Sequence, residues 1–198
     1  MRPDSTPAVV ALAGPNGAGK STVGPALLWD TLGISTFVNA DVIARGLAAF
    51  NPESAAFEAG RVLLERLDEL ARRRVSFAFE TTLAGRAYLR RLKTLVANGY
   101  RFHIVFLWVD SPDLCVARVQ ERVRSGGHAV PEDVIRRRYR SGIENFLQLY
   151  RPLSTSWRVY DNSAAPARLI AAGRESGDLD VQDEATWNRI GEGGDDGV

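Results

Sequence analysis

One stretch constrains the fold of this 198-residue chain more than any other. It is GPNGAGKST, which begins at Gly14 directly after the apolar run AVVALA. It matches the pattern G-x-x-x-x-G-K-[ST], in which a glycine-rich turn joins a buried strand to a helix. The backbone N–H groups of such a turn and the positive end of the helix dipole form an anion site. The sequence therefore predicts a strand, a phosphate-binding loop and a helix at the start of an α/β sheet.

The loop carries the side chains that ATP and Mg²⁺ require. Its glycines allow N–H groups to curl around the phosphates with no Cβ in the way. Lys20 is predicted to reach the outer phosphates and to act in catalysis, and Ser21 to bind Mg²⁺. A chance match in a glycine-rich turn is the alternative, which the flanking strand and helix argue against. The predicted nucleotide-binding residues of the loop are Gly14, Pro15, Asn16, Gly17, Ala18, Gly19, Lys20, Ser21 and Thr22.

The rest of the chain alternates short apolar runs with amphipathic stretches. That alternation predicts an α/β fold, with a parallel sheet of the P-loop NTPase and kinase type and helices on both faces. The run FHIVFLWVD is apolar throughout and is expected at the sheet centre. Residues 54–74 are predicted to form an amphipathic helix. Its apolar face is expected to contain Phe57, Val62, Leu63, Leu67 and Leu70, which recur near helical spacing. Strands are expected at 8–14, 35–41, 75–80, 102–110 and 156–162, and helices at about 20–31, 54–74, 85–99, 111–127, 130–150 and 165–173.

Composition limits the setting in which the chain works. The sequence is 45% hydrophobic and 25% charged, which is typical of a globular domain. No apolar run reaches the ~18 residues of a membrane span, and the N-terminus has no signal-peptide pattern. The single cysteine, Cys115, has no partner for an internal disulfide. We therefore expect a cytoplasmic protein with no membrane contact.

Charge divides the chain into a basic body and an acidic end. Residues 174–198 hold two arginines against eight carboxylates, so the remainder has a net positive charge. Residues 1–173 are predicted to form the P-loop kinase domain, and residues 174–198 an acidic tail with a short helix followed by disorder. Basic residues attract nucleic acid, but here the arginines cluster in one segment, which favours a local polyphosphate site.

Asp41 is the candidate catalytic base. The sequence STFVNAD predicts a strand with Asp41 at its carboxyl end, the edge at which open α/β sheets bind ligands. A carboxylate there can accept the proton of a substrate hydroxyl as the hydroxyl attacks the γ-phosphate. The alternative is that Asp41 caps a helix beginning at Val42. Asn39, two residues earlier, is predicted to be a strand or substrate-positioning residue.

Glu80 ends the run SFAFE in the manner of a Walker B acid. Its carboxylate is predicted to hold the water shell of Mg²⁺ or a substrate hydroxyl. A helix cap near ETTLAG is the alternative interpretation. Thr82 can donate a hydrogen bond to the substrate.

An arginine-rich segment from Arg118 to Arg140 contains no lysine. Arg118 and Arg122 share one helix face, and four more arginines follow the sequence SGGHAVP. Because the arginine fork binds phosphate oxygens bidentately, we predict a lid over ATP at about 118–150. Solvated surface charge with some attraction for nucleic acid is the alternative. His128 lies in the hinge and is a candidate phosphate or substrate contact.

Together these motifs resemble the zeta-toxin-like family of P-loop kinases, especially its short single-domain members. The resemblance covers about residues 8–165 and rests on GPNGAGKST, VNADVIA, FETTLA, GGHAVPEDVIRRRYRSGIENF and YDNS. It implies transfer of phosphate from ATP with Mg²⁺ to a hydroxyl. Toxins of this family phosphorylate UDP-N-acetylglucosamine, so the resemblance also implies a small-molecule substrate and an antitoxin partner.

The resemblance assigns roles to single residues. Lys20 and Ser21 hold phosphate and Mg²⁺, and Asp41 is the base. The resemblance also puts Glu80 and Thr82 on the substrate side, His128 where long toxins carry a lid arginine, and the arginines of the following helix, of which we favour Arg137 and Arg138, on the transferring phosphate. It places Asn162 near the adenine, with a simple turn as the alternative. Within the arginine-rich segment, Arg122 is predicted to act in catalysis and Arg118 to bind the nucleotide. The motif ETTLAG departs from the long toxins, which weakens the transfer of their sugar-nucleotide substrate to this chain.

Two other functions fit the same residues. A nucleoside or polynucleotide 5′-kinase would use the same lid, although no aromatic–basic interleaving for stacking single strands is present. An interaction module controlled by ATP, held by an antitoxin-like partner through the acidic tail, is the non-enzymatic alternative. Nucleic acid ranks below a small molecule as the acceptor.

Overall fold

The computed structural model describes residues 6–24, 26, 34–127 and 129–192. A helix starts at Lys20 and is described through residue 24 and at residue 26; the rest of the helix predicted at 20–31 lies outside the described residues. The strands are β1 (Ala8–Ala13), β2 (Phe37–Val38), β3 (Phe77–Thr81), β4 (Arg101–Trp108), β5 (Ser156–Asp161), β6 (Arg168–Arg174) and β7 (Leu179–Val181). The later helices are α2 (Ala40–Leu47), α3 (Ala56–Arg72), α4 (Leu89–Ala97), α5 (Pro112–Arg124), α6 (Glu132–Asn145) and α7 (Glu184–Glu192). Shorter turns of helix are η1 (Pro52–Ala55), η2 (Phe146–Tyr150) and η3 (Arg151–Leu153).

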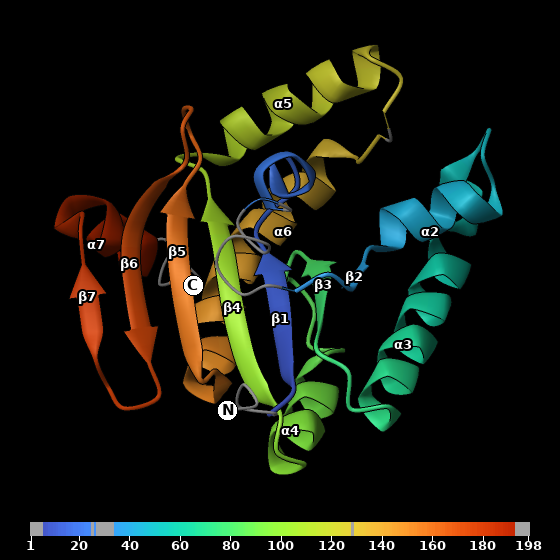
Figure 1. Cartoon of the computed structure of the whole chain (residues 1–198). Helices are drawn as coiled ribbons and strands as arrows, with labels where there is room; N and C mark the ends of the chain where they lie inside the picture. The colour runs from blue at the N-terminus through green and yellow to red at the C-terminus, as the bar shows by residue number, and fades with distance from the viewer. Residues whose placement is uncertain (1–5, 25, 27–33, 128, 193–198) are drawn as a thin grey trace.

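The described strands form one sheet in the order β2-β3-β1-β4-β5-β6-β7 (Figure 1). The first five pair in parallel, whereas β6 and β7 are antiparallel. The α/β prediction is therefore confirmed, and the long apolar strand β4 lies in the middle as expected. Because the parallel strands end at one edge, β1, β3 and β4 all deliver their next residues to the same place.

The prediction of a helix at 165–173 is wrong, because residues 168–174 form strand β6. The run RLIAAG is short and apolar, a pattern that periodicity alone does not assign to strand or helix. Strand β5 offers an open edge, and β6 pairs with it in antiparallel register from Ser156 to Asp161. The predicted domain boundary at residue 173 falls inside β6. The short helix expected in the tail is present as α7, and its Trp187 stacks on Trp157 at 5.2 Å.

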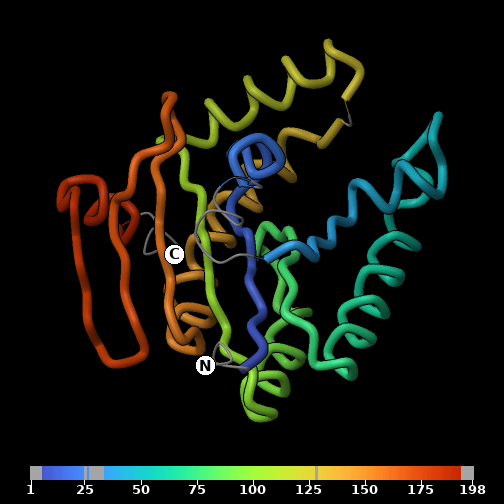
Figure 2. Tube along the Cα trace, viewed as in Figure 1, coloured from blue at the N-terminus to red at the C-terminus, as the bar shows by residue number. Residues whose placement is uncertain are grey.

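Most of the core lies between the sheet and the helices α3, α4, α5 and α6. One face of α6, formed by Ile135, Tyr139 and Ile143, is buried, and it continues to Phe146, whose ring stacks on Phe106 of β4 at 4.7 Å. Figure 2 follows the chain out along α5 and back along α6, which crosses the sheet. The last quarter of the predicted lid, from Ile143 to Tyr150, therefore contributes Ile143, Phe146 and Tyr150 to the core.

Phe57 does not belong to the apolar face of α3. Its side chain is 89% exposed, whereas Ala59, Leu63, Leu67 and Leu70 are buried. Phe57 precedes Leu63 by six residues, which places it about 120° away around the helix axis. None of the helices in the described part of the chain has the length and hydropathy needed to cross a membrane.

Candidate nucleotide and acceptor site

The phosphate loop lies between the end of β1 and the helix that starts at Lys20, as predicted. Gly17 and Gly19 both have a φ near +80°, a left-handed conformation that glycine adopts without strain. A Cβ on Gly17 would stand 2.6 Å from the carbonyl oxygen of Cys115, and one on Gly19 would collide with the Asn162 side chain. The loop is therefore packed against α5 and against the residues that follow β5.

Lys20 is buried at the centre of the site. Its Nζ donates to the carbonyl oxygens of Gly14 and Pro15, each at 2.9 Å, and lies 3.7 Å from the Glu80 carboxylate. Burial lowers the pKa of the Lys20 ammonium, while the carboxylates of Glu80 and Asp41 oppose that shift. The positive charge is thus held inside the loop by one carboxylate in contact and a second nearby.

Glu80 lies on β3 and links three segments of the chain. Its Oε2 accepts a hydrogen bond from Asn39 Nδ2 at 2.7 Å and one from Ser21 Oγ at 3.3 Å. These contacts, with Lys20 opposite, place the carboxylate inside the site, so the helix-cap interpretation of Glu80 is wrong. The run SFAFE therefore delivers an acid to the phosphate loop, as a Walker B element would.

Asn39, and not Asp41, is the N-cap of helix α2, which follows the edge strand β2. Strand β2 ends at Val38, and Asn39 Oδ1 accepts from the N–H groups of Asp41 and Val42 at 2.7 and 3.2 Å. Helix α2 begins at Ala40, so the prediction that the strand extends to Asp41 is wrong. An asparagine side chain satisfies the free N–H groups at a helix start, and this ends the strand early. Asp41 lies exposed in the first turn of α2.

Two cavities meet at this point. One, of about 430 Å³, is lined by the phosphate loop together with Glu80, Arg118 and Asn162. The other, of about 540 Å³, is lined by α2, η1 and the segment after α5. Both cavities are lined by Ser21, Asp41 and Arg122. Asp41 therefore lies between a nucleotide-sized space and a second space.

Arg118 and Asn162 fasten the loop on its other side. Arg118 donates to the carbonyl oxygens of Asn162 and Ser163 at 2.8 and 2.7 Å. The buried Asn162 donates from Nδ2 to the Ala18 carbonyl at 2.9 Å. Both residues line the phosphate cavity. Their bonds to the backbone fix the wall of the phosphate cavity on this side.

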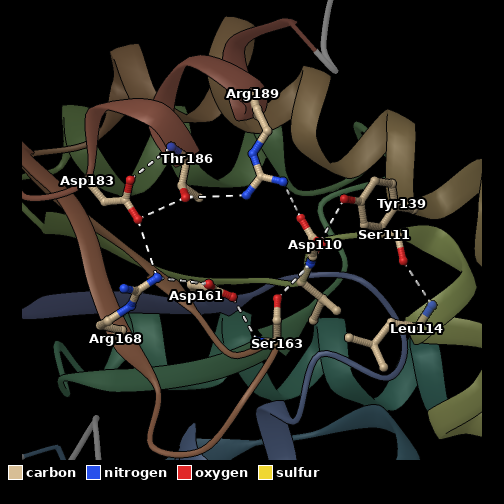
Figure 3. A network of polar contacts seen from close by, with 11 residues as sticks. Asp110, Ser111, Leu114, Tyr139, Asp161, Ser163, Arg168, Asp183, Thr186 and Arg189 are labelled. Atoms are coloured by element: carbon tan, nitrogen blue, oxygen red, sulfur yellow. Dashed lines mark hydrogen bonds and ion pairs between the residues drawn. The ribbon is translucent and has the colours of Figure 1, made fainter.

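A polar network holds the segment after β5 in place (Figure 3). Ser163 Oγ accepts from the Asp110 N–H at 2.8 Å, and the Ser163 N–H donates to Asp161 at 2.8 Å. Arg168 bridges Asp161 and Asp183, and Arg189 of α7 pairs with Asp110. The C-terminal helix is thereby connected to the residues beside the phosphate loop.

The arginines of α6 differ in their surroundings. Arg138 is half-buried and donates to Asn16 Oδ1 of the phosphate loop at 3.3 Å. Burial and the neighbouring Arg137 lower the pKa of Arg138, and Asp41 opposes the shift. Arg137 is exposed, and Arg136 is bound by Asp113 and Glu132 at 2.6 and 2.7 Å. Arg138 is therefore the arginine of this helix in contact with the loop.

The other predicted site residues lie further out or outside the described residues. Thr82 Oγ1 accepts from the Ala84 N–H at 3.4 Å, and in the described part of the chain it lines neither cavity. His128 lies outside the described residues. The turn after β3 is held by Asn145 of α6, which donates to the Leu83 carbonyl at 2.8 Å.

Sequence reasoning missed several residues around the second cavity. Arg45 donates to the Asp41 carbonyl at 3.4 Å and lines this cavity together with the fully exposed Phe50. Asp41 and Arg45 are four residues apart, and in a helix this spacing puts two side chains on the same face. The sequence therefore carried a signal that Arg45 lies beside Asp41. Nothing in the sequence marks Phe50, because the turn at η1 decides where it lies.

The donor set suits Mg²⁺. The Ser21 hydroxyl and the Glu80 carboxylate supply hard oxygens 3.3 Å apart beside the phosphate loop. Among the described residues, no group of three or more His, Cys, Asp and Glu side chains forms a metal cage.

Substitution of Gly19 tests the packing of the loop. We expect Gly19→Ala to weaken ATP binding by at least about tenfold, because its Cβ would displace Asn162 and distort the loop. Gly126→Ala is the matched control, since Gly126 also has a φ of +81° but an added Cβ there would meet no atom within 4 Å. Nucleotide titration by calorimetry measures both. Equal losses in the two variants would contradict the packing argument.

The fold and the site define a P-loop kinase-like domain. The chain belongs to the AAA domain family, which it matches over residues 9–144. An uncharacterised protein of Haemophilus influenzae is 31% identical over 126 residues, which are 64% of this chain and 88% of that protein.

Solved structures share the fold at low sequence identity. The AvrRxo1-ORF1:-ORF2 complex with ATP aligns at a TM-score of 0.71 and 16% identity, covering 93% of this chain. This chain spans 63% of the AvrRxo1 chain. The PezAT chromosomal toxin-antitoxin system of Streptococcus pneumoniae aligns at 0.64 and 12% identity, covering 97% and 86%. A gluconokinase from Sinorhizobium meliloti aligns at 0.50 and 18%, covering 80% and 84%.

Proposed function

We propose that this protein is a kinase that transfers the γ-phosphate of ATP to a hydroxyl of a small molecule. The observation that carries the proposal is the position of Asp41, which lines both the phosphate cavity and the cavity beside it. A donor in one space and an acceptor in the other would meet at this carboxylate. A nucleotide hydrolase has no need for a second space of about 540 Å³ next to the phosphate loop.

The proposed mechanism is direct transfer without a covalent enzyme intermediate. Asp41 accepts the proton of the acceptor hydroxyl, and the loop N–H groups and Lys20 hold the phosphates. Arg138, Arg137 and Arg122 neutralise charge that develops on the transferring group. Mg²⁺, held by Ser21 and Glu80, supplies further charge neutralisation at the phosphates when bound. Catalysis therefore rests on positioning and electrostatics.

The acceptor is proposed to be a small molecule, with a UDP-N-acetyl-amino sugar as the first candidate. Asn39, Glu80 and His128 are proposed on the acceptor side, whereas Thr82, which lines neither of the two cavities, is given no contact with the acceptor. A nucleoside or polynucleotide 5′-kinase is the alternative enzyme. Steep loss of oligonucleotide binding with rising salt would favour that alternative, and no such binding would count against it.

A protein partner is also proposed. The solved structures with this fold include an AvrRxo1-ORF1:-ORF2 complex and a system described as toxin and antitoxin. By analogy we propose that an antitoxin-like protein binds this chain in the cytoplasm. A purely ATP-controlled interaction module would instead show slow ATP turnover with every acceptor and release its partner on nucleotide binding.

Incubation of the protein with ATP, Mg²⁺ and a metabolite extract tests the proposal. We expect one class of metabolite to gain the mass of a phosphoryl group, as measured by mass spectrometry. UDP-N-acetylglucosamine, free nucleosides and a 5′-hydroxyl oligonucleotide are assayed singly beside the extract. The Lys20→Met variant is the inactive control. ATP consumption without any phosphorylated metabolite would overturn the kinase assignment.

A further inference from the structure

The turn after β5, residues 161–163, is in direct contact with the phosphate loop. The buried Asn162 lines the phosphate cavity, and its Nδ2 donates to the Ala18 carbonyl of the loop at 2.9 Å. The carbonyl oxygens of Asn162 and Ser163 accept from Arg118, which lines the same cavity. The position of this turn therefore decides where two residues beside the phosphate loop lie.

Asp161 fixes the conformation of the turn. It is the last residue of β5, and its side chain is only 15% exposed. Its Oδ1 accepts from the Ser163 N–H at 2.8 Å, the hydrogen bond of an Asx turn, which bends the chain at the end of the strand. Among the described residues that line the phosphate cavity, Asp161 is absent. Any effect of its carboxylate on a nucleotide must therefore pass through its neighbours in the turn.

The second oxygen of Asp161 is held by the C-terminal part of the chain (Figure 3). Arg168 Nη2 lies 3.5 Å from Asp161 Oδ2 and 3.4 Å from Asp183 Oδ2. Asp183 precedes α7 and accepts from the N–H and the hydroxyl of Thr186 at 3.0 and 2.9 Å, as a helix cap does. A chain of contacts thus runs from the start of α7 through Arg168 to the turn.

The turn is also held at Ser163. Its Oγ accepts from the Asp110 N–H at 2.8 Å, and the Asp110 carboxylate pairs with Arg189 of α7. The guanidinium groups of both ion pairs are exposed, and an exposed ion pair contributes little by itself. The hydrogen bond from Ser163 to the largely buried carboxylate of Asp161 is therefore the contact on which the turn depends most.

We propose that Asp161 is a positioning residue for ATP, which sets the affinity of the phosphate loop through the turn at 161–163. The inference rests on one part of the proposed function, the binding of ATP at this loop. Without the carboxylate, the Ser163 N–H loses its acceptor, and the turn that carries Asn162 is held less firmly against the loop. Binding of ATP must then also order the turn, and a site that is not ordered beforehand binds its ligand more weakly.

Calorimetric titration of the full chain with ATP and Mg²⁺ tests this role. We expect Asp161→Ala to bind ATP about tenfold more weakly than the parent chain. Asp161→Asn keeps an oxygen that accepts from the Ser163 N–H, so its ATP affinity should stay within about twofold of the parent value. Thr155→Val is the matched control, because Thr155 Oγ1 accepts from the Phe102 N–H at 3.2 Å beside the opposite end of β5. This variant should bind ATP as the parent chain does.

A double-mutant cycle shows whether the effect passes through Asn162. Asp161→Ala should lower ATP affinity by less in the Asn162→Ala background than in the parent chain, since the contact with Ala18 is already lost there. Equal losses in the two backgrounds would overturn the positioning role. Equal ATP affinity in Asp161→Ala and Thr155→Val would overturn it as well.

Two further measurements keep the result clear. Circular dichroism shows whether Asp161→Ala is folded; if it is not, Ser163→Ala decides, because it removes only the acceptor of the Asp110 N–H and should also weaken ATP binding relative to Thr155→Val. Absence of ATP binding by the parent chain would overturn the proposed function together with this inference. Tight binding by the parent chain and by every variant of the turn would overturn the positioning role alone.

Discussion

Asp41→Asn is expected to lower phosphoryl transfer by roughly 10²- to 10⁴-fold while ATP affinity stays unchanged. The amide keeps the size of the side chain but cannot accept the proton of an attacking hydroxyl. Because Asp41 lies exposed in the first turn of α2 and outside the buried core, the variant should fold normally. Single-turnover transfer to the identified acceptor measures the chemical step, and calorimetry measures ATP binding.

The control for Asp41 is another carboxylate of the same cavity. Glu53 also lines the second cavity but does not line the phosphate cavity, so Glu53→Gln should change the KM for the acceptor more than kcat. If Asp41→Asn transferred phosphate at the wild-type rate to every acceptor, the assigned base would be wrong.

Arg138→Gln is expected to lower kcat by about 10³-fold, within the range for arginines that stabilise a transferring phosphoryl group. Arg138 contacts Asn16 in the phosphate loop and is half-buried, so its charge is less screened by water than that of an exposed arginine. Arg138→Lys should recover only part of the rate, since an ammonium lacks the planar fork. Steady-state kinetics with saturating ATP measures all three proteins.

Arg140→Gln is the matched control, because Arg140 is exposed on the same helix. It should retain the wild-type rate. Arg137→Gln tests the neighbouring exposed arginine, which we expect to matter less than Arg138. Similar losses in the variants at 138 and 140 would show that the helix supplies only diffuse positive charge.

Much of the site was predictable because its residues stand at the ends of apolar runs. The pattern around Lys20 predicts a phosphate loop, and Glu80 ends an apolar run that forms the buried strand β3, next to the edge strand β2. Parallel strands deliver their next residues to one edge, so sequence order alone placed these groups together. Asn39 was harder, since an asparagine suits a strand end and a helix cap equally in the sequence.

The strand β6 and the different surroundings of the α6 arginines depend on contacts between distant parts of the chain, which no local sequence pattern reveals. The segment 165–173 is apolar enough for either a helix or a strand. Its residues from 168 onward form β6 because they pair with the free edge of β5. The arginines of α6 look alike in the sequence, yet Asp113 and Glu132 bind Arg136 while Asn16 binds Arg138. The pairing of each guanidinium depends on which helix face meets the loop.

The sequence by itself determined the phosphate loop, the α/β class and the position of Glu80 at the end of an apolar strand run, because each follows from local backbone geometry and hydrophobic pattern. The tertiary structure decided which residues line two adjoining cavities and that Asp41 lies in the lining of both. The physical reason is that cavities form between elements distant in the sequence, where packing governs which side chains face one another.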